Sequence, residues 1–270
     1  MSFELSYRPT QTKIKHHILD QYLKAWGGII VNGSRNQARL AREKGNDFAV
    51  HFVYVDCNAY AGRYLGEQEE IASGETPTTV FGSPIVGVEA LDSLVSYGNE
   101  QEVPVKVNAI LIEEDRETYD ELMASLKLAD LDNRARETQD FGSLLNKEIA
   151  ILHRDSLDLV SDLVQYTQEG FKFSLYFLDP YGPKGIPIGF VRKIVQQERH
   201  DTIINMPYQA LHRRTGSVMK QNPTDEERKL VEHFDDMFGN SEWQKSAKQL
   251  EEEITWKEIL EEATGIEGGV

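Results

Sequence analysis

The segment FSLYFLDPYG, residues 173–182, is the strongest indication of the fold in this sequence. Five of the six residues before Asp179 are apolar or aromatic, which is typical of a buried strand. Pro180 cannot donate to a strand ladder and Gly182 permits a turn, so we expect the strand to end at Asp179. In an open α/β sheet, this carboxyl end of a strand is where ligands bind.

The turn after this strand combines groups that could hold a planar ring with an exocyclic amine. They are the carboxylate of Asp179, the carbonyl of Pro180 and the ring of Tyr181, with Gly182 beside them. The alternative is a β-turn in which the aspartate caps the next segment. The four-residue pattern alone leaves both interpretations open.

Strands and helices alternate along the chain. Ile14, Ile18, Tyr22 and Trp26 recur every four residues, which predicts an amphipathic helix over 10–26, and a basic helix is expected over 34–44. The predicted strands are 48–55, 105–112, 148–152, 175–178 and 202–206, and the predicted core helices are 83–96, 116–127, 156–167 and 188–197. Repeated βα units of this kind predict an α/β fold with a doubly wound, mostly parallel Rossmann-like sheet and right-handed crossovers.

Three regions follow from this pattern. We expect a helical N-terminal segment at 1–47 that packs on the core, a Rossmann-like core at 48–221 and a helical C-terminal extension at 222–270. Thr224 and Glu227 form a capping box at the start of the extension, and Ser83-Pro84 is a helix start with serine as the N-cap. No strand signal follows residue 206, which leaves the last predicted strand at an edge of the sheet. Either the chain is truncated or another element covers that edge.

Composition excludes several classes of protein. No run of eighteen apolar residues exists, so no membrane span is expected, and the N-terminus lacks the pattern of a secretory signal. A lone cysteine, Cys57, cannot form an internal disulfide, which suits a cytoplasmic protein. The net charge of −16 opposes non-specific coating of DNA. Basic residues cluster at 13–24, 35–44 and 213–220, where a local groove and an ordinary solvated helix face both stay open.

Polar or small residues follow the first three predicted strands as well. They are Asp56 with Tyr60, Ala61 and Gly62 after the first strand, Glu113 after the second and Asp155 after the third. Loops after successive strands can hold a nucleoside cofactor. The alternatives are a plain turn, acids at a helix N-terminus and a helix cap. The distance from Asp56 to Glu113 exceeds the roughly twenty residues of a dinucleotide-binding unit, which disfavours NAD and indicates an insertion at 66–81.

These residues resemble the three-Cys-motif partner proteins, a prokaryotic family with a methyltransferase-like Rossmann core. The resemblance runs from about Thr12 to Trp243 and rests on six pieces: Lys15-His16 with the helix to Trp26, Tyr54-Val-Asp56 with Tyr60-Ala-Gly62, Gly82-Ser-Pro84, Leu111-Ile-Glu113, Asp179-Pro-Tyr-Gly182, and Phe238-Gly239 with Trp243. Two departures are extra residues between Asp56 and Tyr60 and the missing C-terminal strand region. The turn at Asp179 is also similar to the Asp-Pro-Phe/Tyr-Gly motif of tRNA guanine-N2 methyltransferases and, more distantly, to the Asp-Pro-Pro-Tyr motif of adenine-N6 methyltransferases.

The resemblance implies a methyltransferase of the class I type that uses S-adenosylmethionine and acts on an exocyclic amine of a nucleobase. Asp179, Pro180 and Tyr181 would then be catalytic, with Gly182 beside them on the substrate side. The residues themselves, and not the resemblance, suggest that the polar segment with Asn205, Arg213 and Arg214 forms one wall of the substrate cleft. The alternative is an exposed connector with scattered charge. In the cofactor site, residues 56–62 would face the methionine part, Glu113 the ribose and Asp155 the adenine amine. No metal is part of this expectation.

Two other functions stay open. One is a non-catalytic or partner-dependent module that binds a protein with a three-cysteine motif, as the family name implies. The other is a phosphoryl-transfer enzyme that holds magnesium between Asp56, Glu113 and Asp179.

Overall fold

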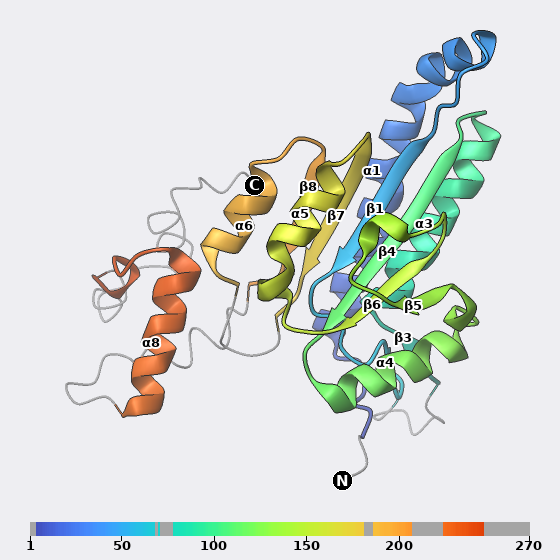
Figure 1. The fold of residues 1–270 in the computed structure, drawn as a ribbon. Coiled ribbons are helices and arrows are strands. Elements are labelled where there is room, and N and C mark those ends of the chain that lie inside the picture. Colours follow the sequence, from blue (N-terminus) through green and yellow to red (C-terminus); the bar gives the residue numbers. More distant parts are fainter. Residues whose placement is uncertain (1–3, 68–69, 71–77, 181–185, 207–223, 246–270) are drawn as a thin grey trace. The chain divides into compact units, whose positions relative to one another are not determined.

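The computed structural model describes residues 4–67, 70, 78–180, 186–206 and 224–245. The chain divides into two compact units, each of which is described by itself. The first comprises Met1–Leu178 with Gln197–Ile203, and the second comprises Asp179–Gln196 with Ile204–Val270. Figure 1 shows the elements of both units.

A six-stranded, all-parallel sheet forms the centre of the first unit, with the strand order β5-β6-β4-β1-β7-β8. Its strands are β1 (Val50–Asp56), β4 (Val105–Glu113), β5 (Ala135–Glu137), β6 (Ile149–His153), β7 (Lys172–Leu178) and β8 (His200–Ile204). The predicted α/β class and the parallel, Rossmann-like sheet are therefore confirmed. The short edge strand β5 was not predicted.

The strand order places a topological switch point beside β1. The chain runs outward from β1 to β4 and β6, and then returns to β7 on the other side of β1. At such a point the two neighbouring connections leave in opposite directions, which opens a crevice at the carboxyl ends of the strands. β1 and β4 lie inside the sheet and are buried almost throughout, which explains their nearly continuous apolar sequence.

Helices flank both faces of this sheet (Figure 1). α1 (Thr10–Glu43) packs against α3 (Ser83–Glu100), and α5 (Val160–Gln168) lies in front of the sheet in the view shown. α4 (Arg116–Leu128) follows β4, and three short 3₁₀ turns are η1 (Asp132–Arg134), η2 (Phe141–Ser143) and η3 (Ser156–Leu159). The N-cap of α3 is Gly82 and not Ser83, because Gly82 has an extended backbone and its carbonyl accepts the first helical bond, from the Val86 amide at 3.0 Å. The helix therefore begins one residue earlier than predicted, and the Gly82 amide bonds to the Gly62 carbonyl at 2.8 Å.

The N-terminal helix differs from its prediction in two ways. The structure has one helix of 34 residues where two were predicted, and its buried face carries Leu19, Leu23 and Val31. Ile14 and Ile18 of the predicted apolar stripe are instead 54% and 50% exposed. The close approach of α3 explains this choice of face: a Cβ on Gly27 would lie 2.3 Å from Leu94, so the glycine side of α1 must face α3.

The second unit contains α6 (Ile188–Val195) and α8 (Asp225–Phe238). The predicted capping box is present, since the Thr224 side chain accepts from the Glu227 amide and the Glu227 side chain accepts from the Thr224 amide. A small separate core gathers around Trp243, with Phe234 and Phe238 against its ring. The Trp243 Nε1–H donates to Asp235 at 2.7 Å, which satisfies the polar atom of this buried ring.

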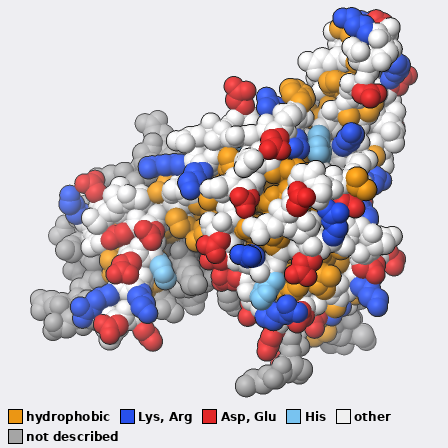
Figure 2. Space-filling model, viewed as in Figure 1, with side chains coloured by type: hydrophobic (Ala, Val, Ile, Leu, Met, Phe, Trp, Pro, Cys, Tyr) orange, Lys and Arg blue, Asp and Glu red, His pale blue; other side chains and the backbone are white. Residues whose placement is uncertain are grey.

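Charges of both signs are interspersed over the face shown in Figure 2, with acidic side chains frequent around α8. Within the described ranges, no helix combines the length and the apolar character needed to cross a membrane.

Candidate cofactor site

The loop after β1 is fixed to the strands on both sides of it. The Cys57 amide donates to the carbonyl of Phe177 in β7 at 3.1 Å, and the Ala59 amide donates to the carbonyl of Ile112 in β4 at 2.9 Å. The loop therefore lies at the switch point and joins the carboxyl ends of both neighbouring strands. Its backbone is held in place by the protein alone, which is the preorganisation that a binding loop needs.

Packing and backbone conformation together require a glycine at position 62. Gly62 has a φ of 70°, and a Cβ there would lie 2.9 Å from Leu122. The neighbouring Ala61 carbonyl accepts from the Ser125 hydroxyl at 2.6 Å, and the Ala61 side chain is fully buried. A ligand at this loop would consequently meet backbone atoms rather than the Ala61 side chain.

Asp56 is fully buried at the end of β1. Its carboxylate accepts from the Tyr54 hydroxyl at 2.9 Å and from the Asn58 amide at 3.3 Å. Burial, followed by the charge of Asp56, raises the pKa of Tyr54 well above its usual value, so this hydroxyl keeps its proton and donates. Asp56 thus orients the first turn of the loop. Direct contact between Asp56 and a ligand stays a prediction, and its burial counts against it.

Glu113 lies at the end of β4 and connects two loops. Its Oε2 accepts from the Tyr60 amide at 2.8 Å, and its Oε1 accepts from the Asp115 amide at 2.9 Å. Burial raises the pKa of Glu113, and the two backbone hydrogen bonds oppose that rise. An ionised carboxylate has about four lone-pair sites, so two amide bonds leave it the capacity to accept hydroxyl protons as well.

The other acids near this edge cap helices. Asp115 is the N-cap of α4 and accepts from the Thr118 amide. Asp155 is exposed and caps η3, accepting from the Leu157 amide at 2.9 Å. Capping is therefore an observed role of Asp155, and its contact with an adenine amine stays a prediction.

The second unit brings two of the predicted substrate-side residues together. The side-chain Nδ2 of Asn205 donates to Oδ1 of Asp179 at 2.7 Å, although the two residues are 26 positions apart in the sequence. Both side chains are half-buried, as is Pro180. Tyr181, Gly182, Arg213 and Arg214 lie outside the described residues.

Sequence reasoning missed two features of this edge. The bond from Tyr54 to Asp56 joins two residues that alternation alone would place on the same face of β1, so the i, i+2 spacing was a usable signal. The ion pair of Arg8 with Glu67 joins positions 59 residues apart, and no local pattern indicates it. In the described part of the chain, no group of three or more His, Cys, Asp or Glu residues is arranged to hold a metal ion.

No protein-family model, curated protein or solved structure matches this chain.

Proposed function

We propose that this protein is an S-adenosylmethionine-dependent methyltransferase that acts on an exocyclic amine of a nucleobase. The observation that carries the proposal is the position of Glu113. The buried carboxylate at the end of β4, which lies beside β1 in the Rossmann-like sheet, is bonded to the loop after β1. In this class of sheet, that position accepts the hydroxyl protons of a ribose.

In this proposal, the loops after β1, β4 and β6 would hold a nucleoside with an amino-acid tail. Glu113 would accept from the ribose hydroxyls, and the backbone of residues 57–62 would face the methionine part. The exposed Asp155 would lie toward the adenine amine. When bound, the cofactor supplies a methyl group on a positively charged sulfur.

The residues of the second unit would orient the amine. Asn205 holds one oxygen of Asp179, which fixes the direction of the carboxylate. Asp179 would accept one amine proton, the Pro180 carbonyl would accept the other, and Tyr181 would stack on the ring. Held in this way, the amine would point its lone pair toward the methyl group that the cofactor supplies, and Asp179 would be the acceptor for the proton that the amine loses. Most of the rate gain in such a step comes from positioning and exclusion of water.

A role as a protein-binding module is the second candidate. The residues Ile14, Ile18 and Ile29 of α1 are 54%, 50% and 74% exposed, which is unusual for isoleucines along one helix. This surface, together with the resemblance to the three-Cys-motif partner proteins, supports a protein partner of that kind. The two candidates are compatible, because a partner can deliver the substrate.

Calorimetry with S-adenosylhomocysteine tests the main proposal. The parent protein should bind it, and Glu113→Ala should weaken binding by about 1–3 kcal/mol through loss of charge-assisted hydrogen bonds. Glu114→Ala removes an exposed neighbouring acid and is the matched control, with unchanged affinity expected. A parent protein that does not bind the compound contradicts the proposal, and equal affinities of the two variants contradict the assignment of the ribose to Glu113.

A further inference from the structure

The N-terminal segment is joined to the far end of the loop that follows β1. This loop passes through the short strand β2 (Arg63–Tyr64), which pairs with β3 (Val80–Phe81). The Leu65 amide then donates to the Ser6 carbonyl at 2.9 Å, and the Arg8 amide donates to the Gly66 carbonyl at 2.7 Å. The residues before α1 thus form an additional pairing beside the loop.

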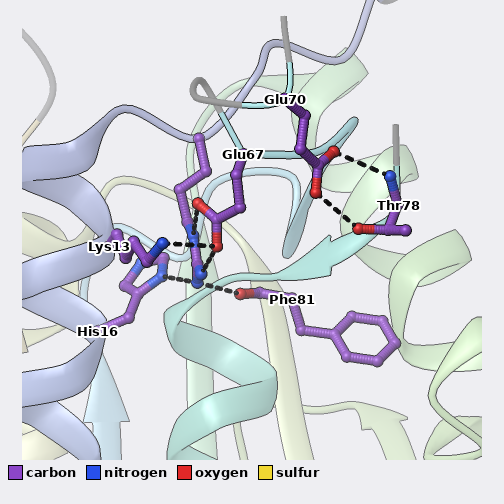
Figure 3. A network of polar contacts seen from close by, with 7 residues as sticks. Lys13, His16, Glu67, Glu70, Thr78 and Phe81 are labelled. Atoms are coloured by element: carbon purple, nitrogen blue, oxygen red, sulfur yellow. Dashed lines mark hydrogen bonds and ion pairs between the residues drawn. The ribbon is translucent and has the colours of Figure 1, made fainter. Parts of the chain in front are cut away.

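The Arg8 side chain strengthens this junction. Its Nε donates to Oε2 of Glu67 at 3.2 Å, its Nη2 pairs with Oε1 of Glu67, and its Nη1 donates to the Phe81 carbonyl at 3.5 Å. Lys13 adds a second cation, 3.8 Å from Oε1 of Glu67 (Figure 3). The side chains of Arg8 and Glu67 are only 12% and 16% exposed, so water and salt screen this pair less than a surface pair.

His16 connects Arg8 to the aromatic residues of the loop. Its Nδ1 lies 3.4 Å from Nη1 of Arg8, and its ring centroid lies 5.9 Å from that of Tyr64. Burial, and then the charges of Arg8 and Lys15, lower the pKa of His16 to about 3, so the ring is neutral at neutral pH. Because arginine can only donate, Nδ1 must be the acceptor and Nε2 must carry the proton.

The connection continues to Glu113. Tyr64 stacks on Tyr60, with 6.1 Å between ring centroids and 29° between ring planes. The Tyr60 amide is the group that donates to Glu113. Tyr60 has a φ of 52°, a conformation that a tyrosine adopts only when its surroundings hold it there.

We propose that Arg8 and Glu67 are positioning residues: through His16, Tyr64 and Tyr60 they hold the Tyr60 amide on Glu113, and so keep its carboxylate oriented for the hydroxyl groups of a nucleoside ligand. The identity of that ligand rests on the proposed function above. The part of the proposal that concerns the hold on the Tyr60 amide rests only on contacts within the first unit. The N-terminal segment is therefore a structural part of the ligand site, although it lies about fifty residues before the loop in the sequence.

Amide hydrogen exchange of the full chain tests, without any ligand, whether Arg8 and Glu67 hold the Tyr60 amide in place. In Glu67→Gln and in Arg8→Ala, exchange at Tyr60 should become about tenfold faster, while exchange at Ile110 in the centre of β4 should change much less. The ratio of the two rates separates loosening of the loop from general destabilisation. Arg39→Ala removes an exposed ion pair of α1 with Glu43 and is the matched control. An unchanged ratio in Glu67→Gln would overturn the inference, whether or not the protein binds the cofactor.

Calorimetry with S-adenosylhomocysteine on the same variants tests the consequence. Affinity should fall about five- to tenfold in Arg8→Ala and Glu67→Gln and stay unchanged in Arg39→Ala. Faster exchange at Tyr60 with unchanged affinity would overturn the role of these residues at the ligand site. If the parent binds no cofactor, the proposed function fails, and the exchange ratio still decides whether Arg8 and Glu67 hold the Tyr60 amide in place.

Discussion

The two edges of the central sheet use polar residues in different ways. At the carboxyl edge, Glu113 and the loop after β1 connect segments that are far apart in the sequence. At the amino edge, an open cavity of about 750 Å³ is lined by residues that include His51, Lys106, Phe171 and Lys172. The cavity is thus at the edge where parallel sheets do not usually bind ligands.

The contacts of Lys172 explain the difference. Its amine donates to the carbonyls of Tyr166 and Glu169 at 2.8 Å each and lies over the Tyr166 ring. This lysine therefore satisfies backbone groups near the end of α5, where a helix leaves carbonyls without helical partners. At the amino edge the polar group completes a helix end, whereas at the carboxyl edge the polar groups fix one loop to another. The proposed ligand site therefore rests on contacts between loops and not on the volume of a cavity.

Replacement of Asp179, which directly follows β7 in the chain, should have the largest effect. Asp179→Ala should reduce methyl transfer from labelled S-adenosylmethionine to nucleic acid at least about a hundredfold, because the amine loses its acceptor. Affinity for S-adenosylhomocysteine should stay within about tenfold, or 1.4 kcal/mol. Asp236→Ala, an exposed acid of α8, is the control. If Asp179→Ala retains turnover, Asp179 is not a catalytic residue.

The buried histidine beside the carboxyl edge should make stability depend on pH. The pKa of His16 is about 3 in the folded chain against an ordinary 6.5, so below pH 6.5 the unfolded chain binds the extra proton. The contribution of His16 to the free energy of unfolding is therefore fully present above pH 6.5 and decreases as the pH falls toward 3. Between pH 7 and pH 4.5 the parent should lose about 3 kcal/mol more than His16→Gln does. Urea unfolding at both pH values measures this difference, and the exposed His17→Gln is the control. If the free energy of unfolding of the parent and of His16→Gln falls equally with pH, the prediction is wrong.

The hydroxyl of Tyr54 should contribute more to stability than a hydroxyl at the surface. Tyr54→Phe leaves the buried carboxylate of Asp56 without one donor and should lower the free energy of unfolding by about 1–3 kcal/mol. The comparison is Tyr97→Phe, whose hydroxyl bonds to the exposed Asn32 and should matter by less than about 0.5 kcal/mol. Equal effects in urea unfolding would show that the bond from Tyr54 to Asp56 does not hold the loop.

The smallest effect is expected at the amino edge. Lys106 lines the cavity and is exposed, so Lys106→Ala should change the free energy of unfolding by no more than about 0.5 kcal/mol. Affinity for S-adenosylhomocysteine should change less than about twofold, in calorimetry beside Glu113→Ala. A larger loss of affinity in Lys106→Ala than in Glu113→Ala would reverse the comparison and place the ligand at the amino edge.

Local sequence determined the layers of the fold and the positions of several acids. Apolar runs such as Phe173–Leu178 can be buried on both faces only inside a sheet covered by helices, and the predicted strands agree with β1, β4, β6, β7 and β8 to within a few residues. The capping box at Thr224 and the cap at Asp155 depend on neighbours within three residues. Contacts of such short range are encoded in short sequence patterns, which is why sequence alone predicted them.

Tertiary structure decided which of the compatible surfaces and contacts form. α1 carries apolar residues on two sides, and only the approach of Leu94 to Gly27 selects Leu19 and Leu23 for burial over Ile14 and Ile18. The carboxylates of Asp56 and Glu113 were predicted from similar positions at strand ends. Packing bonds Asp56 to the Tyr54 hydroxyl within the core, whereas Glu113 accepts from the backbone of two loops. The partners of Arg8 and Asp179 are 59 and 26 residues away in the sequence. Whether such residues meet in space depends on how every intervening element packs. A periodic sequence pattern carries no information about such distances, so only the folded chain could supply them.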